Sequence, residues 1–274
     1  MFSIDFRQIG IIAGKEFWDR IRNRWVLAVG IVFTVFALVI AYFGAAQQGA
    51  VGFRSIDVTI ASLVSLVIYL IPLIALILGF DAIVGERERG SLDLLLTLPI
   101  TRKELILGKY AGLAGALAFS TIAGFGAVGL ILSPQLNLNA LFHYAGFMGS
   151  AILLGFAFLS LAVMLSVFAA DRTRASGLAI GMWFFFVLVF DLLLLGALVV
   201  TAGDYGGDIF PYLLLLNPAD VFRVLNVFSL DEVRTLYGLA TVFPEALSNP
   251  ATLGGVMLAW IVGPLAVAIW RFER

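Results

Sequence analysis

Long apolar runs constrain this chain more than any other feature of its sequence. A helix needs about 20 mostly apolar residues to cross the hydrocarbon core of a bilayer, and six stretches reach about that length. Hydrophobic residues make up 62% of the chain and charged residues 13%, against about 45–50% and about 25% in soluble proteins. The expected spans are residues 25–46, 58–80, 110–132, 141–169, 175–200 and 251–270. We therefore predict an all-α polytopic membrane protein in which residues 1–274 form one transmembrane domain with six transmembrane helices.

The basic residues are distributed unequally between the two ends of this predicted bundle. Of 17 Lys and Arg, 14 lie in the segments 1–24, 85–109, 171–174 and 271–274, and three lie on the opposite side. Cytoplasmic loops of membrane proteins carry the excess of Lys and Arg. We therefore expect both termini and the loop after the second span in the cytoplasm, and the segment 201–250 on the outer side.

The N-terminal segment 1–24 has the pattern of an amphipathic helix. Its apolar residues recur at helical spacing, and its basic residues lie elsewhere on the helical wheel. The apolar positions are Phe6, Ile9, Ala13, Phe17 and Ile21. Such a helix suits the membrane interface, with its axis in the plane of the bilayer. The alternative is a solvated leader that feeds the first span.

The loop 85–109 is longer and more apolar than a connection between two spans requires. Gly90 and Pro99 punctuate it. The leucines on one face of the short helix between them are Leu92, Leu95 and Leu96. Thr101 and Glu104 have the spacing of a capping box, which predicts the start of the next helix. We expect a short, leucine-faced helix flanked by charge at the cytoplasmic face, or alternatively a helix lying on the membrane.

The segment 201–250 is too apolar for a solvated loop and is broken by Pro218. Asn217 can cap a helix that has Pro218 at its first position, and Ser229 with Glu232 has the spacing of a second capping box. Irregular backbone at membrane depth must be covered by protein. We therefore predict two short re-entrant or extracellular helices that pack on the bundle.

The residues needed for catalysis or for a metal site are scarce. The chain has no cysteine, and His143 is its only histidine, so nucleophilic catalysis has few partners. No lysine stands in the GxxxxGK[ST] pattern of a phosphate-binding loop. We therefore expect no catalytic residue, no metal ligand set and no cofactor in this chain. If it transports a solute, the energy comes from a partner ATPase or from an ion gradient.

Asp191 stands inside the fifth predicted span. A carboxylate near the bilayer midplane costs about 2.5–3.5 kcal/mol on insertion scales, so it is a candidate functional residue by default. Asp191 is therefore a candidate for the transport pathway. The alternative is that it lies nearer the interface, or is protonated and hydrogen-bonded to a neighbouring helix.

Glycines in two of the predicted spans permit close helix packing. Gly112, Gly124 and Gly129 lie in the third span, and Gly177 and Gly181 in the fifth have GxxxG spacing. Small residues let two membrane helices approach closely. The sequence does not distinguish contacts within the chain from contacts between two chains.

The loop 85–109 also resembles a known family. The run from Glu86 to Leu96, followed by the residues 98–102 and by Gly108-Lys109, is similar to the hallmark of ABC-2 type permeases. These are the membrane subunits of ATP-binding-cassette transporters whose ATPase is a separate chain. The resemblance extends over the whole length, and the string from Asn217 to Arg223 is also similar to a recurrent feature of the family.

The resemblance implies that the loop contacts a cytoplasmic ATPase subunit. The residues expected to make this contact are Glu86, Arg87, Glu88, Arg89, Leu92, Asp93, Leu95, Leu96, Arg172 and Arg174. The three leucines would be the apolar anchors, and the arginines at 172 and 174 a smaller second contact. ATP would be bound by the partner and not by this chain.

Within the family, the chain is most similar to permeases that serve the maturation of nitrous oxide reductase. This similarity implies a bacterial inner-membrane homodimer, paired with ATPase subunits and with a periplasmic protein that helps to assemble the copper-sulfur centre. The alternatives are an ABC-2 permease that exports a polysaccharide, lipid or drug, a membrane scaffold, and a secondary transporter, which would show internal repeats. The cargo and the direction of transport stay open.

Overall fold

The computed structural model describes residues 5–22, 25–43, 56–132, 138–200, 211–227 and 249–274, and its regular elements are helical throughout these ranges. The long helices are α1 (Phe6–Arg22), α2 (Trp25–Phe43), α3 (Ile56–Gly79), α6 (Arg102–Leu132), α7 (Leu138–Phe168), α8 (Arg172–Phe184), α9 (Phe190–Val200), α11 (Pro218–Val227) and α14 (Pro250–Glu273). The short elements are α4 (Val84–Glu88), α5 (Ser91–Thr97), the π-helical segment η3 (Phe185–Val189) and the 3-10 segment η4 (Leu214–Leu216).

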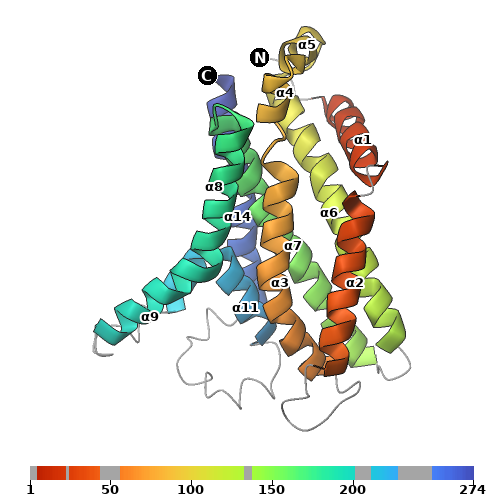
Figure 1. Cartoon of the computed structure of the whole chain (residues 1–274), viewed down its shortest axis with the longest axis vertical. Helices are drawn as coiled ribbons and strands as arrows, with labels where there is room; N and C mark the ends of the chain where they lie inside the picture. The colour runs from red at the N-terminus through yellow and green to blue at the C-terminus, as the bar shows by residue number, and fades with distance from the viewer. Residues whose placement is uncertain (1–4, 23–24, 44–55, 133–137, 201–210, 228–248) are drawn as a thin grey trace.

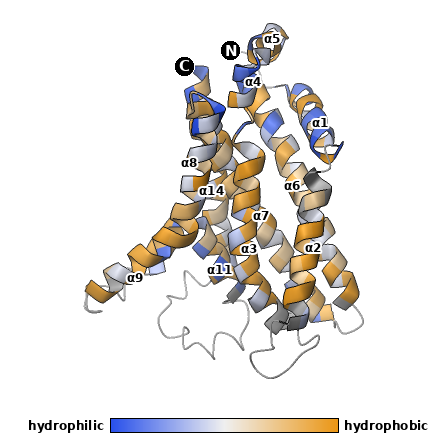
Figure 2. Cartoon of the chain, viewed as in Figure 1, coloured by the Kyte–Doolittle hydropathy of each residue, from blue (hydrophilic) through white to orange (hydrophobic). Residues whose placement is uncertain are grey.

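The helices form one elongated bundle with two distinct ends (Figure 1). Helices α1, α4 and α5 and the last turn of α14 lie at one end, which we name the α5 end; α11 lies near the other, which we name the α11 end. Hydrophilic residues gather on α1, α4 and the last turn of α14, whereas α2, α3 and α9 are mostly hydrophobic (Figure 2). The N-terminal helix, the loop after the second span and the C-terminal tail therefore share one end, as predicted.

The predicted polytopic all-α fold is confirmed. Five helical stretches are long and apolar enough to cross a membrane, and they match the second to sixth predicted spans. They are Ser62–Glu88, Arg102–Ile131, Leu138–Phe168, Arg172–Ala197 and Pro250–Glu273. The first predicted span, 25–46, corresponds to α2, an apolar helix of 19 residues.

Helix α7 is the centre of the bundle. It packs against α3, α6, α11 and α14, and 72% of its most apolar stretch is buried. Phe147 on α7 contacts Phe125 of α6 edge-on and Phe222 of α11 at a tilt. By contrast, only 22% of the apolar stretch of α8–α9 is buried, so most of that arm faces outward.

The glycines of α6 are used within the chain. A Cβ atom at Gly112 would stand 2.6 Å from the Ala13 carbonyl oxygen of α1, and one at Gly124 would stand 2.7 Å from Phe33 of α2. A side chain at either position would therefore push the helices apart. Gly177 and Gly181 of α8 differ, because nothing lies within 4 Å of a Cβ built on either of them.

The fifth predicted span contains a feature that the sequence did not predict. It is one continuous helical stretch, but η3 interrupts its α-helical pattern between α8 and α9. π-helical turns in α-helices are rare and occur often at functional sites. This one ends two positions before Asp191.

Candidate functional site

The chain after α3 is anchored to α7 before it leaves the bundle. The backbone amides of Ile83 and Val84 both donate to the hydroxyl oxygen of Ser166, at 2.9 and 3.0 Å. Gly90, with φ of +69°, then separates α4 from α5. Glycine adopts this left-handed conformation without steric cost, so Gly90 sets the direction in which α5 leaves α4. The predicted short helix between Gly90 and Pro99 is confirmed.

The predicted capping box at the start of α6 is also confirmed. The Glu104 amide donates to the Thr101 hydroxyl at 3.2 Å, and the Thr101 amide donates to Glu104 Oε2 at 2.7 Å. The other oxygen of the Glu104 carboxylate accepts the Asp5 amide at 2.7 Å. One side chain thus caps α6 and holds the chain just before α1.

Lys109 forms the most enclosed ionic contact at the α5 end. Its ammonium lies 3.0 Å from a Glu16 oxygen and 3.0 Å from a Glu86 oxygen. The Lys109 side chain is 5% exposed, and those of Glu16 and Glu86 are 10% and 14% exposed. Glu86 also accepts the Ser91 hydroxyl. A buried ion pair is tolerated when further hydrogen bonds satisfy its atoms. This cluster, which we name the Lys109 cluster, ties α1, α4 and α6 together.

The two regions that were predicted to contact the ATPase are the loop 85–109 and the short loop that contains Arg172. They lie side by side. The Glu88 carboxylate accepts the Arg172 amide at 2.7 Å, and the Arg172 guanidinium contacts Asp81 at 3.1 Å. Arg87 donates to the Ala169 carbonyl oxygen at 2.9 Å. Helix α4 is therefore bound to the turn between α7 and α8.

Arg174 and Arg89 remain on the surface. The Arg174 amide donates to Asp171 at the N-cap of α8, at 2.8 Å, and its guanidinium contacts the same carboxylate at 3.2 Å. Arg89 contacts Glu86 at 3.4 Å with 57% of its side chain exposed. Both side chains are accessible to a partner.

The leucine face of α5 packs against the protein's own bundle, whereas it was expected to face a partner. Leu92 is only 8% exposed, and Leu95 and Leu96 are partly buried against the core of the chain. The expectation that Leu92 is an outward anchor is therefore wrong, because the helix presents that face to its own bundle. The exposed leucines of this region are Leu94, at 70%, and Leu98, at 53%. Leu94 lies on the opposite face of α5, and Leu98 is the residue that directly follows the helix.

Asp191 belongs to a second polar cluster, near the α11 end. Its carboxylate lies 3.0 Å from the Arg223 guanidinium, which also contacts Asp220 at 2.6 Å. Asn217 donates to Asp220 and to the Phe186 carbonyl oxygen within η3, both at 2.8 Å. Asp191 is thus ion-paired with a neighbouring helix, and its place in the transport pathway stays a prediction. Burial raises the pKa of Asp220, and the Arg223 charge opposes part of that increase.

The predicted cap of α11 is confirmed, since the Asn217 side-chain oxygen accepts the Ala219 amide at 3.0 Å and Pro218 is the first helical residue. Helix α11 packs on α3, α7 and α14, as expected for a helix that must be covered by protein. The second predicted capping box, Ser229 with Glu232, lies outside the described residues.

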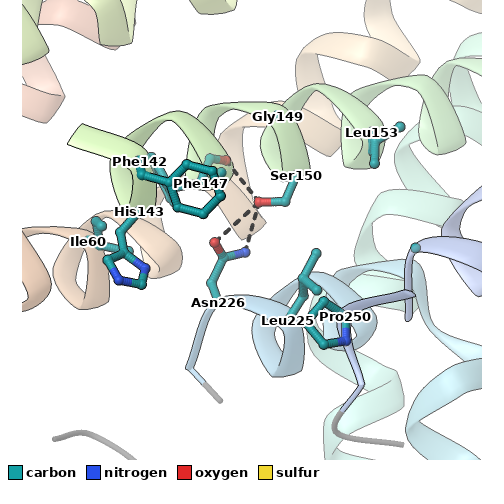
Figure 3. A pocket seen from close by; sticks show the side chains of 12 residues that line it. Ile60, Phe142, His143, Phe147, Gly149, Ser150, Leu153, Leu225, Asn226 and Pro250 are labelled. Atoms are coloured by element: carbon teal, nitrogen blue, oxygen red, sulfur yellow. Dashed lines mark hydrogen bonds between the residues drawn. The ribbon is translucent and has the colours of Figure 1, made fainter. Parts of the chain in front are cut away.

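A cavity of about 590 Å³ opens beside α11 (Figure 3). His143 and Ser150 of α7 and Asn226 of α11 line it among mostly apolar side chains. Asn226 donates to the Ser150 hydroxyl at 3.0 Å and to the Phe222 carbonyl oxygen at 2.8 Å. Among the described residues, no three His, Cys, Asp or Glu side chains are grouped as metal ligands would be.

Several residues that organise these sites escaped the sequence reasoning. Lys109 was considered only as a basic residue of the loop 85–109 and as part of the family string, and its partner Glu16 was not singled out. A signal was present in the sequence, because Glu16 lies on the same helical face as Ile9 and Ala13. A carboxylate on the packing face of an amphipathic helix requires a buried cation as its partner.

Comparison with known proteins gives a consistent result. Residues 11–274 match the family described as "ABC-2 family transporter protein". A protein of Pseudomonas aeruginosa named "Probable ABC transporter permease protein NosY" is 45% identical over 270 residues, which cover 96% of this chain and 97% of the relative. A protein of Stutzerimonas stutzeri with the same name is 44% identical over 271 residues, which cover 97% and 98% of the two chains.

Proposed function

Since this chain belongs to the ABC-2 family of ABC transporter permeases, we propose that a separate cytoplasmic ATPase drives it through a docking surface on α4 and α5. The α5 end then faces the cytoplasm, and so do both termini of this multi-pass protein of the bacterial inner membrane. The 14 Lys and Arg in the segments of this end support that orientation, because basic residues favour the cytoplasmic side. The chain binds no ATP itself and is a transport subunit.

The exposed face of α5 carries this proposal. Leu94 and Leu98 are 70% and 53% exposed, and Asp93, Glu88 and Arg89 are exposed beside them. Stable interfaces have an apolar centre and a polar rim, and a few central side chains dominate their affinity. The two exposed leucines therefore replace Leu92 as the proposed anchors, and the charged residues form the rim.

The contacts behind α5 support a mechanical role for this surface. A force applied to α4 or α5 reaches α7 through Ser166 and the Ala169 carbonyl, and reaches α1 and α6 through Lys109. The bond from Arg172 to Glu88 links the same surface to α8. Movement of the ATPase would thus be transmitted to four helices at once.

A homodimer is the assembly that we propose for the permease itself. Helix α8 presents Gly177 and Gly181, with open space around both, next to the exposed side chains of Leu178, Ile180 and Phe184. Small residues on an apolar face permit close packing of membrane helices. Two copies related by a twofold axis could bury this face against each other, and each copy would dock one ATPase subunit.

We further propose that the transporter serves the maturation of nitrous oxide reductase, together with a periplasmic protein that helps to assemble the copper-sulfur centre. The proposal is supported by the 45% identity with the Pseudomonas aeruginosa relative over 96% of the chain. Deletion in a nitrous-oxide-respiring host should leave the reductase synthesised but inactive. Normal activity of the reductase in the deletion strain would instead favour export of another substrate.

The docking surface is tested by two matched pairs of substitutions. Leu94→Asp with Leu98→Asp places two charges in the proposed anchor and should abolish retention of the ATPase in pull-down from membranes. Leu138→Asp with Leu141→Asp is the control, because these leucines of α7 are 83% and 50% exposed but lie in its first turns, towards the α11 end. Both variants should reach the membrane in normal amounts. Full retention of the ATPase by the variant with Asp at positions 94 and 98 would contradict the assignment of α5 as the docking element.

A further inference from the structure

A second cavity, of about 460 Å³, lies at the α5 end between α5, the end of α7 and the end of α14. We propose that it binds the phosphate headgroup of an anionic phospholipid, with Arg87, Arg102, Arg271 and Arg274 as the phosphate ligands. All four arginines line the cavity, and Asp93 is the only acidic residue among its lining residues. The site is separate from the proposed docking leucines.

The four guanidinium groups differ from the other cations of the α5 end in their partners. Among the described residues, none of them takes part in an ion pair, whereas Arg20, Lys103 and Lys109 at the same end do. Like charges around one cavity repel each other, and an anion between them removes that cost. Guanidinium groups bind phosphate with two parallel hydrogen bonds each.

The arginines are held in place by contacts that leave donors available. Arg87 donates to the Ala169 carbonyl oxygen at 2.9 Å, and Arg102 donates to the Phe272 carbonyl oxygen at 2.6 Å. The Arg271 guanidinium lies 5.8 Å from the centre of the Phe168 ring. Each guanidinium has five N–H donors. One or two carbonyl or ring contacts for each arginine therefore leave further donors for a ligand.

The surroundings favour a lipid over a free anion. The cavity also has apolar lining residues, Leu92, Leu96, Val167, Phe168 and Phe272. The side of α14 that faces away from the bundle is broad and apolar, and its exposed residues include Trp270, Val267, Val262 and Leu258, which are 42–62% exposed. Acyl chains could lie along that side while the phosphate remains among the arginines. Basic pockets between membrane helices on the cytoplasmic side bind such headgroups, and a headgroup with two phosphates best matches four positive charges.

The test uses the purified full-length permease and measures bound cardiolipin by native mass spectrometry and by a titration against thermal stability. Wild-type protein should bind cardiolipin more tightly than phosphatidylcholine. Arg271→Gln with Arg274→Gln should weaken cardiolipin binding by roughly 25-fold, since each basic residue near an anionic surface contributes about fivefold. Arg7→Gln with Arg22→Gln is the control, because it removes two exposed charges from α1 and should leave cardiolipin affinity unchanged.

Four outcomes would overturn the proposal. Equal cardiolipin affinity in the two double variants would show that the cavity is not the site. Equal binding of phosphatidylcholine would remove the role of charge. Stabilisation by inorganic phosphate alone, with no added effect of lipid, would indicate a free-anion site. Displacement of cardiolipin when the ATPase binds, with crosslinks from the cavity to acidic residues of the ATPase, would assign the arginines to that interface.

Discussion

Lys109 at the α5 end and Arg223 near the α11 end each lie between two carboxylates, and the two clusters differ in what they connect. Lys109 joins Glu16 and Glu86, which are 93 and 23 residues away in the sequence, so that cluster links three helices. Arg223 joins Asp220 of its own helix and Asp191 of α9, and its side chain is 41% exposed. The first arrangement fixes the proposed docking surface to the bundle, and the second links α9 to α11.

The neighbours of the two clusters differ as well. Arg20 and Arg89 lie 3.4 Å from the carboxylates of the Lys109 cluster and balance its second negative charge. Near Arg223, the described contacts add no further cation, and burial raises the pKa of Asp220. The comparison predicts that ion pairs hold the α5 end together, whereas the stability of the α11 end depends on the protonation of Asp220.

The largest effect is expected from Lys109→Met. It removes the buried cation and leaves Glu16 and Glu86 with only Arg20 and Arg89, each at 3.4 Å. Loss of one partner of a buried ion pair costs about 3–5 kcal/mol. Thermal unfolding in detergent should detect this loss. Lys103→Met is the matched control, because it removes an ion pair to Glu273 that is about 40% exposed on both sides and should cost about 1 kcal/mol at most. Equal losses of thermal stability in Lys109→Met and Lys103→Met would contradict the proposed difference between a buried and a surface ion pair.

Asp191→Leu should abolish the biological activity while the protein still enters the membrane. Arg223 keeps Asp220 as its partner at 2.6 Å, so the change opens the contact between α9 and α11 without leaving a lone buried charge. Reductase maturation in the host, compared with the amount of permease in the membrane, separates the two effects. Asp191→Glu should retain much of the activity, and normal maturation with the leucine variant would reduce Asp191 to a packing residue.

The pH dependence of stability should distinguish the two ends. A carboxyl whose pKa is raised by folding stabilises the folded state fully below its unfolded pKa of about 4, and this contribution is lost as the pH rises through the folded value. The unfolding temperature of the wild type should therefore fall as the pH rises above about 4. In Asp220→Asn it should fall less steeply. Lys103→Met should keep the slope of the wild type. An unchanged slope in the asparagine variant would show that Asp220 does not respond to pH.

The smallest effect is expected from Arg89→Ala. Its ion pair with Glu86 is 57% exposed on the arginine side, and exposed pairs contribute about 0–1 kcal/mol. The variant should retain the ATPase almost fully in pull-down. A loss as large as that of the Leu94 and Leu98 pair would make the rim, and not the apolar centre, the basis of docking.

Local signals in the sequence predicted local structure well. The capping box of Thr101 with Glu104 and the cap at Asn217 depend on residues within three positions of each other, and both are confirmed. The direction of Leu92 could not be predicted, because helical periodicity groups residues on one face without saying what that face contacts. Lys109 and Glu16 meet only because α6 packs on α1, and that long-range contact has no local pattern.

The close packing of α1 against α6 has a consequence for biogenesis. The residues that α1 contacts, including Lys109, are translated about 90 residues later, and at about 5–20 residues per second this delay amounts to roughly 5–20 seconds. During that time two further apolar helices, α2 and α3, must be inserted. Helix α1 must therefore lie elsewhere until α6 has been synthesised. Its exposed residues Ile11 and Trp18 suit a position on the surface of the bilayer. Final assembly of this end then waits until the ribosome has passed the third span.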